Sequence, residues 1–117
     1  MAVYDRFDVV VVPFPFTDRA TTKRRPALVL SGAEPFNRAT GHVLLAMITS
    51  ARHSHWPLDT AITDLDRAGL PSPSMVRMKL FTLDGRFILR SLGRLADDDR
   101  ALVADALQIL LEAPSQR

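Results

Sequence analysis

The side chains best suited to chemistry in this sequence are basic, and they gather in the middle of the chain. Between Arg19 and Arg94 there are 12 Lys and Arg against 5 Asp and Glu, a local balance of +7 in a 117-residue protein whose net charge is +2. Such a stretch favours a phosphate backbone as its partner, although the solvated surface of a small domain has the same pattern. The charge pattern therefore admits nucleic acid as a partner without requiring it.

Other kinds of site have less to build on. The chain has no cysteine, which excludes disulfides, thiolate zinc sites and a cysteine nucleophile. His53 and His55 flank Ser54, but no further ligand stands at metal spacing, so we expect no metal and no cofactor. A proton-transfer role for either histidine stays open. Trp56, the single tryptophan, either stacks on an unpaired base or caps the core.

The compartment also follows from what the sequence lacks. No apolar run approaches the ~20 residues that span a bilayer, and no signal for secretion is visible. A chain without cysteine is compatible with a reducing compartment. We therefore expect a cytoplasmic protein with no membrane partner.

The elements that must position these residues are mostly strands. Runs of β-branched and apolar residues predict strands at residues 7–12, 25–31, 42–49, 58–63 and 74–78. The first run is apolar enough to indicate burial on both faces, and it is expected to end in a turn over residues 13–16. Asp84 and Gly85 predict a hairpin turn between strands at 80–83 and 87–89. Residues 32–41 are predicted to form an ordered loop.

The end of the chain has a helical pattern. Three aspartates at positions 97–99 place negative charge at a helix start, and Pro114 ends the segment about four turns later. The apolar stripe from Leu102 to Leu111 is wider than one sheet usually covers, which indicates a second subunit. Short strands followed by one helix predict a single domain over residues 1–117, mainly β, in which the helix packs on a small, partly closed antiparallel barrel.

Four collinear segments resemble the signature blocks of MazF/PemK toxins. They are DVVVVPFPFTD at 8–18, KRRPALVLS at 23–31, ITS at 48–50, and the PemK-like set of PSMVR, KLFTLD and GRL within 73–95. The resemblance implies an SH3-like half-open barrel of the CcdB/Kid/MazF kind, a homodimer and a cognate antitoxin. It also implies sequence-specific, metal-independent cleavage of single-stranded mRNA that leaves 2′,3′-cyclic phosphate and 5′-hydroxyl ends.

The resemblance further implies where the chemistry lies. The family's catalytic pair, an Arg before the Pro of the second block and the Thr of the third, corresponds to Arg25 and Thr49. An arginine fork matches the non-bridging oxygens of a phosphate, and a threonine hydroxyl can donate to the same group. A guanidinium is a poor general base, so whether Arg25 or a histidine moves the proton stays open. Further candidates for RNA contact are Lys23, Arg24, Ser50, Arg52, Trp56, Arg77 and Lys79.

Two positions depart from the family, and two other functions suit the same fold. The family usually has Gly before the Asp of the first block, where this chain has Phe7. Some members carry an acidic residue two positions after Arg77, where this chain has Lys79. A CcdB-like inhibitor of DNA gyrase and an inactive barrel that binds RNA or protein are the alternatives. Arg25 together with Thr49 favours the nuclease.

Overall fold

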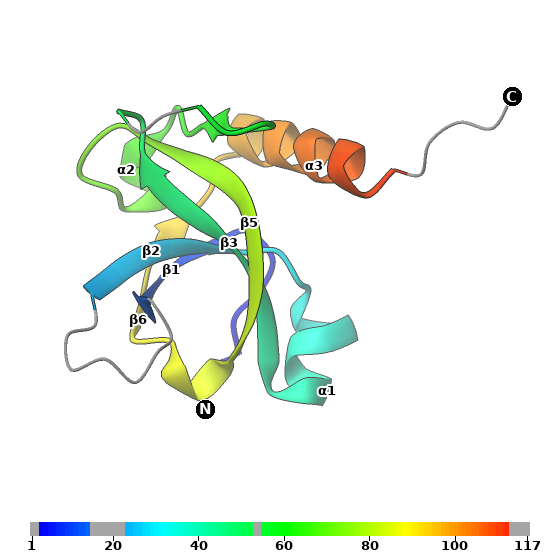
Figure 1. Cartoon of the computed structure of the whole chain (residues 1–117). Helices are drawn as coiled ribbons and strands as arrows, with labels where there is room; N and C mark the ends of the chain where they lie inside the picture. The colour runs from blue at the N-terminus through cyan, green and yellow to red at the C-terminus, as the bar shows by residue number, and fades with distance from the viewer. Residues whose placement is uncertain (1–2, 15–22, 53–54, 113–117) are drawn as a thin grey trace, which may run out of the picture.

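The computed structural model describes residues 3–14, 23–52 and 55–112. Figure 1 shows a sheet that curls into a half-open barrel, with α3 (Asp97–Leu111) across one end and α1 (Arg38–Thr40) at the other. The strands in the described part of the chain are all antiparallel, and their order in the sheet is β4-β5-β3-β2-β1-β6. They are β1 (Asp8–Phe14), β2 (Lys23–Val29), β3 (His42–Ser50), β4 (Thr60–Ala61), β5 (Ser74–Asp84) and β6 (Arg90–Arg94). This is the mainly β fold class predicted from the sequence.

A hydrophobic core lies on each face of the sheet. Alternate residues of a strand point to opposite faces, so Val9 packs in the core that includes Val103 of α3, whereas Val10 packs in a second core that includes Ile88. Residues 9–12 are all buried. The prediction that the first strand is covered on both faces is therefore confirmed.

The first strand does not end at Pro13. β1 continues to Phe14, and Pro13 lies opposite Arg24 of β2. β6 pairs with β1 only as far as Val11, so beyond that residue one side of β1 is an edge, where a strand tolerates a proline. β1 thus ends two residues past the predicted strand, and the Pro15 and Phe16 part of the expected turn lies outside the described residues.

The segment 32–41 is helical rather than a loop. A π-helical turn, η1 (Ala33–Asn37), leads into α1, and Gly41 with φ +73° ends it. Asn37 is buried because its amide donates to the carbonyls of Tyr4 and Ser31 and its oxygen accepts from the Ser31 hydroxyl. The Pro, Asn and Gly pattern of a loop is here the pattern of a short helix that these bonds anchor.

The hairpin predicted at Asp84 and Gly85 does not form. Residues 74–84 make one strand, β5, which pairs with β3 as far as Asp84, whereas β4 pairs with it only at Met75 and Val76. A turn of 3-10 helix, η2 (Gly85–Phe87), carries the chain across to β6, which pairs with β1 instead. Of the strand predicted at 58–63, only the two residues of β4 are extended.

The predicted terminal helix is confirmed, and a short helix was not foreseen. α3 begins at Asp97 with three aspartates in its first turn, and Pro114 lies outside the described residues. The unforeseen turn, α2 (Leu65–Ala68), packs against β6 so closely that a Cβ on Gly93 would lie 2.3 Å from the carbonyl oxygen of Arg67. No helix in the part of the chain that the structure describes is long and apolar enough to cross a membrane.

Phe7 adopts the left-handed backbone conformation that glycine favours, with φ +74°. Hydrogen bonds hold this residue on both sides, because its N–H donates to the Val29 carbonyl at 2.7 Å and its carbonyl accepts from the Leu95 N–H at 3.1 Å. The substitution of the glycine that is usual in the family therefore leaves the entry to β1 in a strained conformation.

Candidate active site

Arg25 and Thr49 lie on the same face of two neighbouring strands. β2 and β3 pair from Val29 with Leu45 to Ala27 with Met47, and Arg25 and Thr49 each lie two residues beyond that last pair. A shift of two residues along a strand preserves the face, so both side chains lie on the face that carries Ala27 and Met47. Both residues are half-buried, which leaves each one partly accessible to a ligand.

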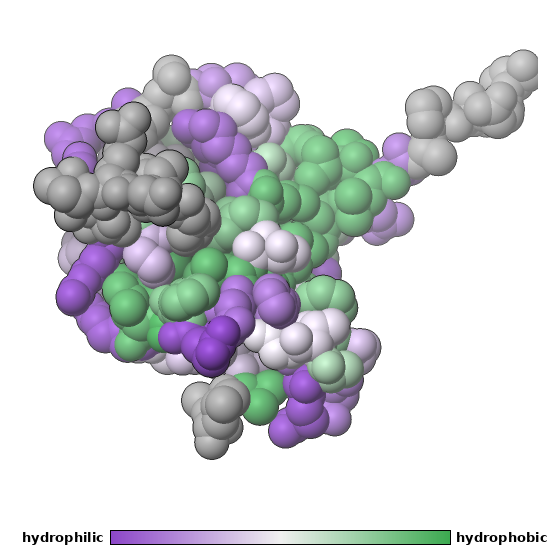
Figure 2. Space-filling view, turned by 60° about the horizontal axis from the view of Figure 1, so that its bottom comes forward, coloured by the Kyte–Doolittle hydropathy of each residue, from purple (hydrophilic) through white to green (hydrophobic). Residues whose placement is uncertain are grey.

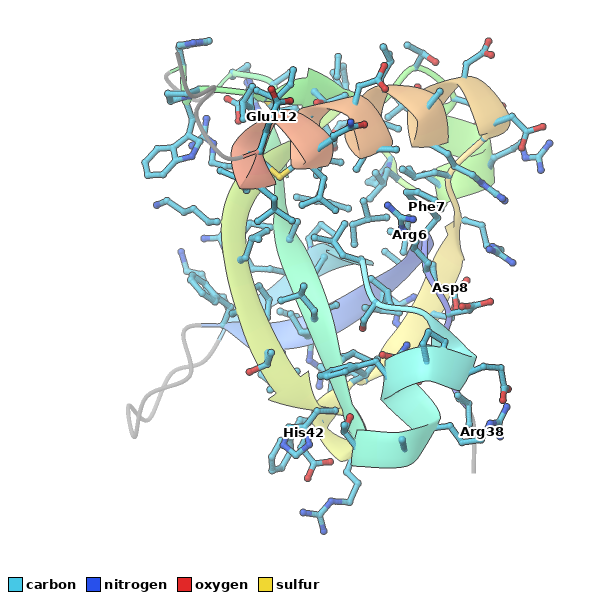
Figure 3. The ribbon with its side chains drawn as sticks, turned by 90° about the vertical axis from the view of Figure 1, so that its right-hand side faces the viewer. Arg6, Phe7, Asp8, Arg38, His42 and Glu112 are labelled. Carbon is cyan, nitrogen blue, oxygen red and sulfur yellow. The ribbon has the colours of Figure 1, made fainter. Side chains whose placement is uncertain are left out.

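β5 adds two cationic side chains to this face. Arg77 lies opposite Met47 and two residues after Met75, which pairs with Thr49. The register shifts between Ala46 and Met47, and Lys79 follows on the same side of β5 by alternation. β3 runs from His42 near α1 to Ser50 near α3, so Thr49 lies toward the α3 end of the molecule (Figure 3).

A buried carboxylate holds Arg77 in place. The Arg77 Nε and Nη2 donate to the two Asp59 oxygens at 3.2 and 2.9 Å, and the side chains are only 11% and 7% exposed. The hydrogen bonds and charge of Asp59 raise the pKa of Arg77 above its ordinary value. Arg77 is therefore a neutralised, oriented guanidinium rather than a freely available cation, which weakens the prediction that it contacts phosphate directly.

Trp56 lies against the same cations. Its ring centroid is 4.6 Å from the Lys79 Nζ and 5.7 Å from the Arg77 guanidinium carbon, and the residue is 37% exposed. Its backbone N–H donates to Asp59 Oδ2 at 3.0 Å. Of the two readings of Trp56, these contacts favour a surface ring beside the site over a cap on the core. Within the described residues Lys79 forms no ion pair, so its charge is available to a ligand.

The other residues predicted to contact RNA lie near this face of the sheet, but their side chains do not all point to it. Lys23 and Arg24 are exposed at the start of β2, and alternation turns the Arg24 side chain to the face opposite that of Arg25. A hollow of about 410 Å³ on that opposite face is lined by Arg24 and Arg90 and also reaches Arg25. The Ser50 hydroxyl accepts from the Arg52 N–H at 3.2 Å, and Arg52 is exposed in the turn after β3.

The structure also places the residues considered for proton transfer and for metal binding. His55 is exposed, while His53 and Ser54 lie outside the described residues. No three His, Asp or Glu side chains of residues 3–14, 23–52 and 55–112 come together as metal ligands. A larger hollow of about 490 Å³ lies beside α1 at the far end of β3, and none of the predicted site residues lines it.

Asp59 is the residue that sequence reasoning missed. It is one of only five acids in the basic middle of the chain and stands three residues after the single tryptophan, and that isolation was the available signal. Its contact with Arg77 spans 18 residues of sequence and passes through the pairing of β4 with β5. Only the folded sheet makes this partnership visible.

A half-open β-barrel with a terminal helix and a row of cationic and hydroxyl side chains at one end defines a small basic barrel protein suited to an extended polyanion. The sequence profile of PemK-like, MazF-like toxins of type II toxin–antitoxin systems matches residues 5–111. The chain therefore belongs to this toxin family, as the signature blocks indicated. No curated protein matches the chain.

Solved structures agree with this assignment. The MazE–MazF structure (Form-III) from Deinococcus radiodurans is 29% identical, with 97% of this chain and 100% of that chain covered and a TM-score of 0.76. MazF (Form-I) from the same organism is 27% identical over 97% and 100% of the chains, with a TM-score of 0.74. Mycobacterium tuberculosis toxin MazF-mt6 shares the fold at 21% identity over 92% and 99%, with a TM-score of 0.67.

Proposed function

We propose that this protein is an endoribonuclease toxin that cuts single-stranded RNA at specific sites without a metal ion. The observation that carries the proposal is that strand alternation puts Arg25 of β2 and Thr49 of β3 on one face of the sheet. Lys79 lies on the same face and has no acidic partner among the described residues. Membership of the MazF-like toxin family supports the same activity.

The proposed reaction uses a nucleophile supplied by the substrate. The 2′-hydroxyl oxygen bonds to the adjacent phosphorus and loses its proton, while the bond from phosphorus to the 5′-oxygen breaks and that oxygen gains a proton. The products are a 2′,3′-cyclic phosphate and a 5′-hydroxyl. The protein must align the strand and stabilise the extra negative charge on the non-bridging oxygens.

Arg25 and Thr49 suit this electrostatic task. The guanidinium of Arg25 keeps its charge and offers paired donors to the non-bridging oxygens. The Thr49 hydroxyl, at the end of β3, donates to the same phosphate from the neighbouring strand. Lys79 stabilises the phosphate backbone beside the scissile group.

The test is cleavage of a long RNA by the purified protein in EDTA, with the fragment ends mapped. We expect discrete cuts with cyclic phosphate and 5′-hydroxyl ends, and a loss of about 10²–10³ in rate for Arg25→Ala. Arg38→Ala is the matched control, because Arg38 is an exposed arginine at the α1 end of the molecule (Figure 3). RNA that stays intact, or an Arg25→Ala variant as active as the wild type, contradicts the proposal.

We also propose a cognate antitoxin with an acidic, flexible segment as the protein partner. The central charge balance of +7 supports this, because an acidic segment complements it electrostatically. The solved MazE–MazF structures from Deinococcus radiodurans, with which this chain shares its fold, are complexes of the two proteins named in their titles.

A homodimer is the third part of the proposal. Figure 2 shows apolar surface over the C-terminal half of α3, which leads into the terminal tail. Four large apolar side chains of this helix are between 40% and 70% exposed, namely Leu102, Ile109, Leu110 and Leu111. Monomeric proteins rarely expose such a continuous patch, so a second copy of the chain is its expected cover.

A further inference from the structure

The Asp59 carboxylate joins two parts of the candidate site, Trp56 and Arg77. It accepts from the Arg77 Nε and Nη2, and its Oδ2 also accepts from the Trp56 N–H at 3.0 Å. The Asp59 N–H in turn donates to the Trp56 carbonyl at 3.1 Å. One carboxylate therefore fixes both the backbone of Trp56 and the guanidinium beside its ring.

These contacts lie close to Thr49 of the candidate site. Val76 pairs with Ile48 on one side and with Thr60 on the other, so one row crosses β3, β5 and β4. Asp59, Arg77 and Thr49 are each the next residue to a member of that row. Neighbouring strands are about 4.8 Å apart, which separates β3 from β4 by ~10 Å. Trp56 thus lies within reach of a nucleotide next to one bound at Thr49.

We propose that Asp59 is a positioning residue that holds the Trp56 indole as the stacking surface for the base beside the scissile phosphate. The inference rests on the proposed RNA cleavage. Proteins that bind single strands sequence-specifically stack unpaired bases on aromatic rings. A ring that is already fixed in position loses less conformational entropy when a base stacks on it. Lys79, 4.6 Å from the ring centroid, supplies a charge for the adjoining phosphate.

A purely structural ion pair would have different consequences. Breaking a buried pair leaves one charge without compensation, whereas removing both charges is often well tolerated by the fold. The double variant Asp59→Asn with Arg77→Met therefore separates the two roles, because it removes the anchor without an unpaired buried charge. Asp59→Glu keeps the carboxylate and tests rescue. Glu34→Gln with Arg38→Met removes an exposed ion pair away from the site and is the matched control, because it too leaves the net charge unchanged.

The experiment uses the only tryptophan as its probe. Indole fluorescence of the full chain is titrated with a mixed-sequence 2′-O-methyl RNA oligonucleotide, which cannot be cut because its 2′-oxygen carries no proton to lose. Cleavage of an unmodified RNA gives kcat and KM for the same proteins, and thermal unfolding reports their folding. We expect the double variant to raise the dissociation constant and KM about tenfold with kcat changed less than about threefold. Asp59→Glu should recover most of the affinity, and Glu34→Gln with Arg38→Met should match the wild type.

The outcomes separate this inference from the proposed function. A folded double variant with wild-type KM and fluorescence response overturns the role of Asp59, even if the wild type cleaves RNA. A wild type whose indole does not respond to the oligonucleotide overturns it too. If the RNA stays intact but the response depends on Asp59, the proposed nuclease activity fails while the positioning role stands. If the double variant and Asp59→Glu lose the same affinity for the oligonucleotide while thermal unfolding is unchanged, the carboxylate does not position Trp56.

Discussion

Phe7 shows how a single residue resolves a conflict between backbone strain and packing. Its φ of +74° costs an L-residue about 1–2 kcal/mol relative to an ordinary conformation. The ring packs against the core beneath α3, and the guanidinium carbons of Arg6 and Arg100 lie 4.7 and 5.8 Å from its centroid. Figure 3 shows Arg6, Phe7 and Asp8 together beneath α3. Packing and the two cations offset the strain.

We predict an inverted order of stability for substitutions at this position. Phe7→Ala loses the packing and keeps the strain, whereas Phe7→Gly loses the packing and relieves the strain. Both variants should be less stable than the wild type. The free energy of unfolding of the glycine variant should be about 1 kcal/mol higher than that of the alanine variant. Urea unfolding measures the difference. Leu80, in the same core at an ordinary strand position, is the control: there the alanine variant should be more stable than the glycine variant. If the alanine variant is the more stable one at both positions, the backbone of Phe7 is not strained.

At the scale of elements, Asp99 fastens α3 to the chain before α2. Its fully buried carboxylate accepts from the Thr63 N–H and hydroxyl and from the Asp64 N–H at 2.8 to 3.1 Å. Burial alone would raise the pKa of Asp99, but the hydrogen bonds from Asp64 and Thr63 outweigh it and hold the pKa below its ordinary value of 3.8. The helix is thus tied down by an ionised group.

Because the folded pKa is depressed, the carboxylate stabilises the fold above a pH of about 4, and that contribution is lost as the pH falls through the folded value. Asp99→Asn should lower the free energy of unfolding at pH 7 by about 1–3 kcal/mol, since an amide cannot accept from all three donors. The variant should also lose part of the wild type's acid sensitivity. Asp98→Asn, an exposed neighbour in the same turn, is the control. Equal pH profiles for wild type and Asp99→Asn would contradict this role.

The other face of α3 tests the proposed homodimer. Only Asp99, Val103 and Ala106 of this helix are buried, and its C-terminal half extends past the sheet in Figure 1. Ile109→Lys should shift the mass in solution from twice the 13.0 kDa of one chain to a single chain. Ala39→Lys adds the same charge at an exposed position of α1, at the other end of the molecule, and should leave the dimer intact. Sedimentation velocity measures both, and a dimer that survives Ile109→Lys places the interface elsewhere.

At the scale of the whole molecule, the cations differ in whether they have an acidic partner. Arg38 and Arg86 near α1 pair with Glu34 and Asp84, and Arg77 at the site pairs with Asp59. Lys79 has no acidic partner within the described residues, so its charge favours binding of a polyanion at the site.

This asymmetry predicts a position-dependent salt effect on RNA binding. Each phosphate contact to a single strand contributes about 0.7 to the slope of log affinity against log salt. Lys23→Gln, at the exposed start of β2, should reduce the slope by about this amount, and Arg38→Gln should leave it unchanged. Fluorescence titrations across a salt series give the slopes. A slope that falls equally in both variants would mean that the whole surface, and not one end, attracts RNA.

The sequence alone determined the strands with strong local patterns, the terminal helix and the family. β-branched runs and charged helix starts act over a few residues, so β1, β3 and α3 are visible without a fold. The tertiary structure decided which strands are neighbours, because pairing depends on contacts between distant segments. The Asp84–Gly85 pattern predicted a hairpin, yet the chain after Gly85 crosses to the other edge of the sheet, where β6 pairs with β1.

The candidate site divides in the same way. Arg25 and Thr49 could be identified as candidate site residues from the signature blocks, because residue types are given directly by the sequence. That both side chains lie on one face followed from the pairing of β2 with β3, and that Arg77 is neutralised by Asp59 followed from β4 lying beside β5. Residue type is a local property and survives in the sequence, whereas the partner of each charge depends on a sheet that only long-range packing assembles.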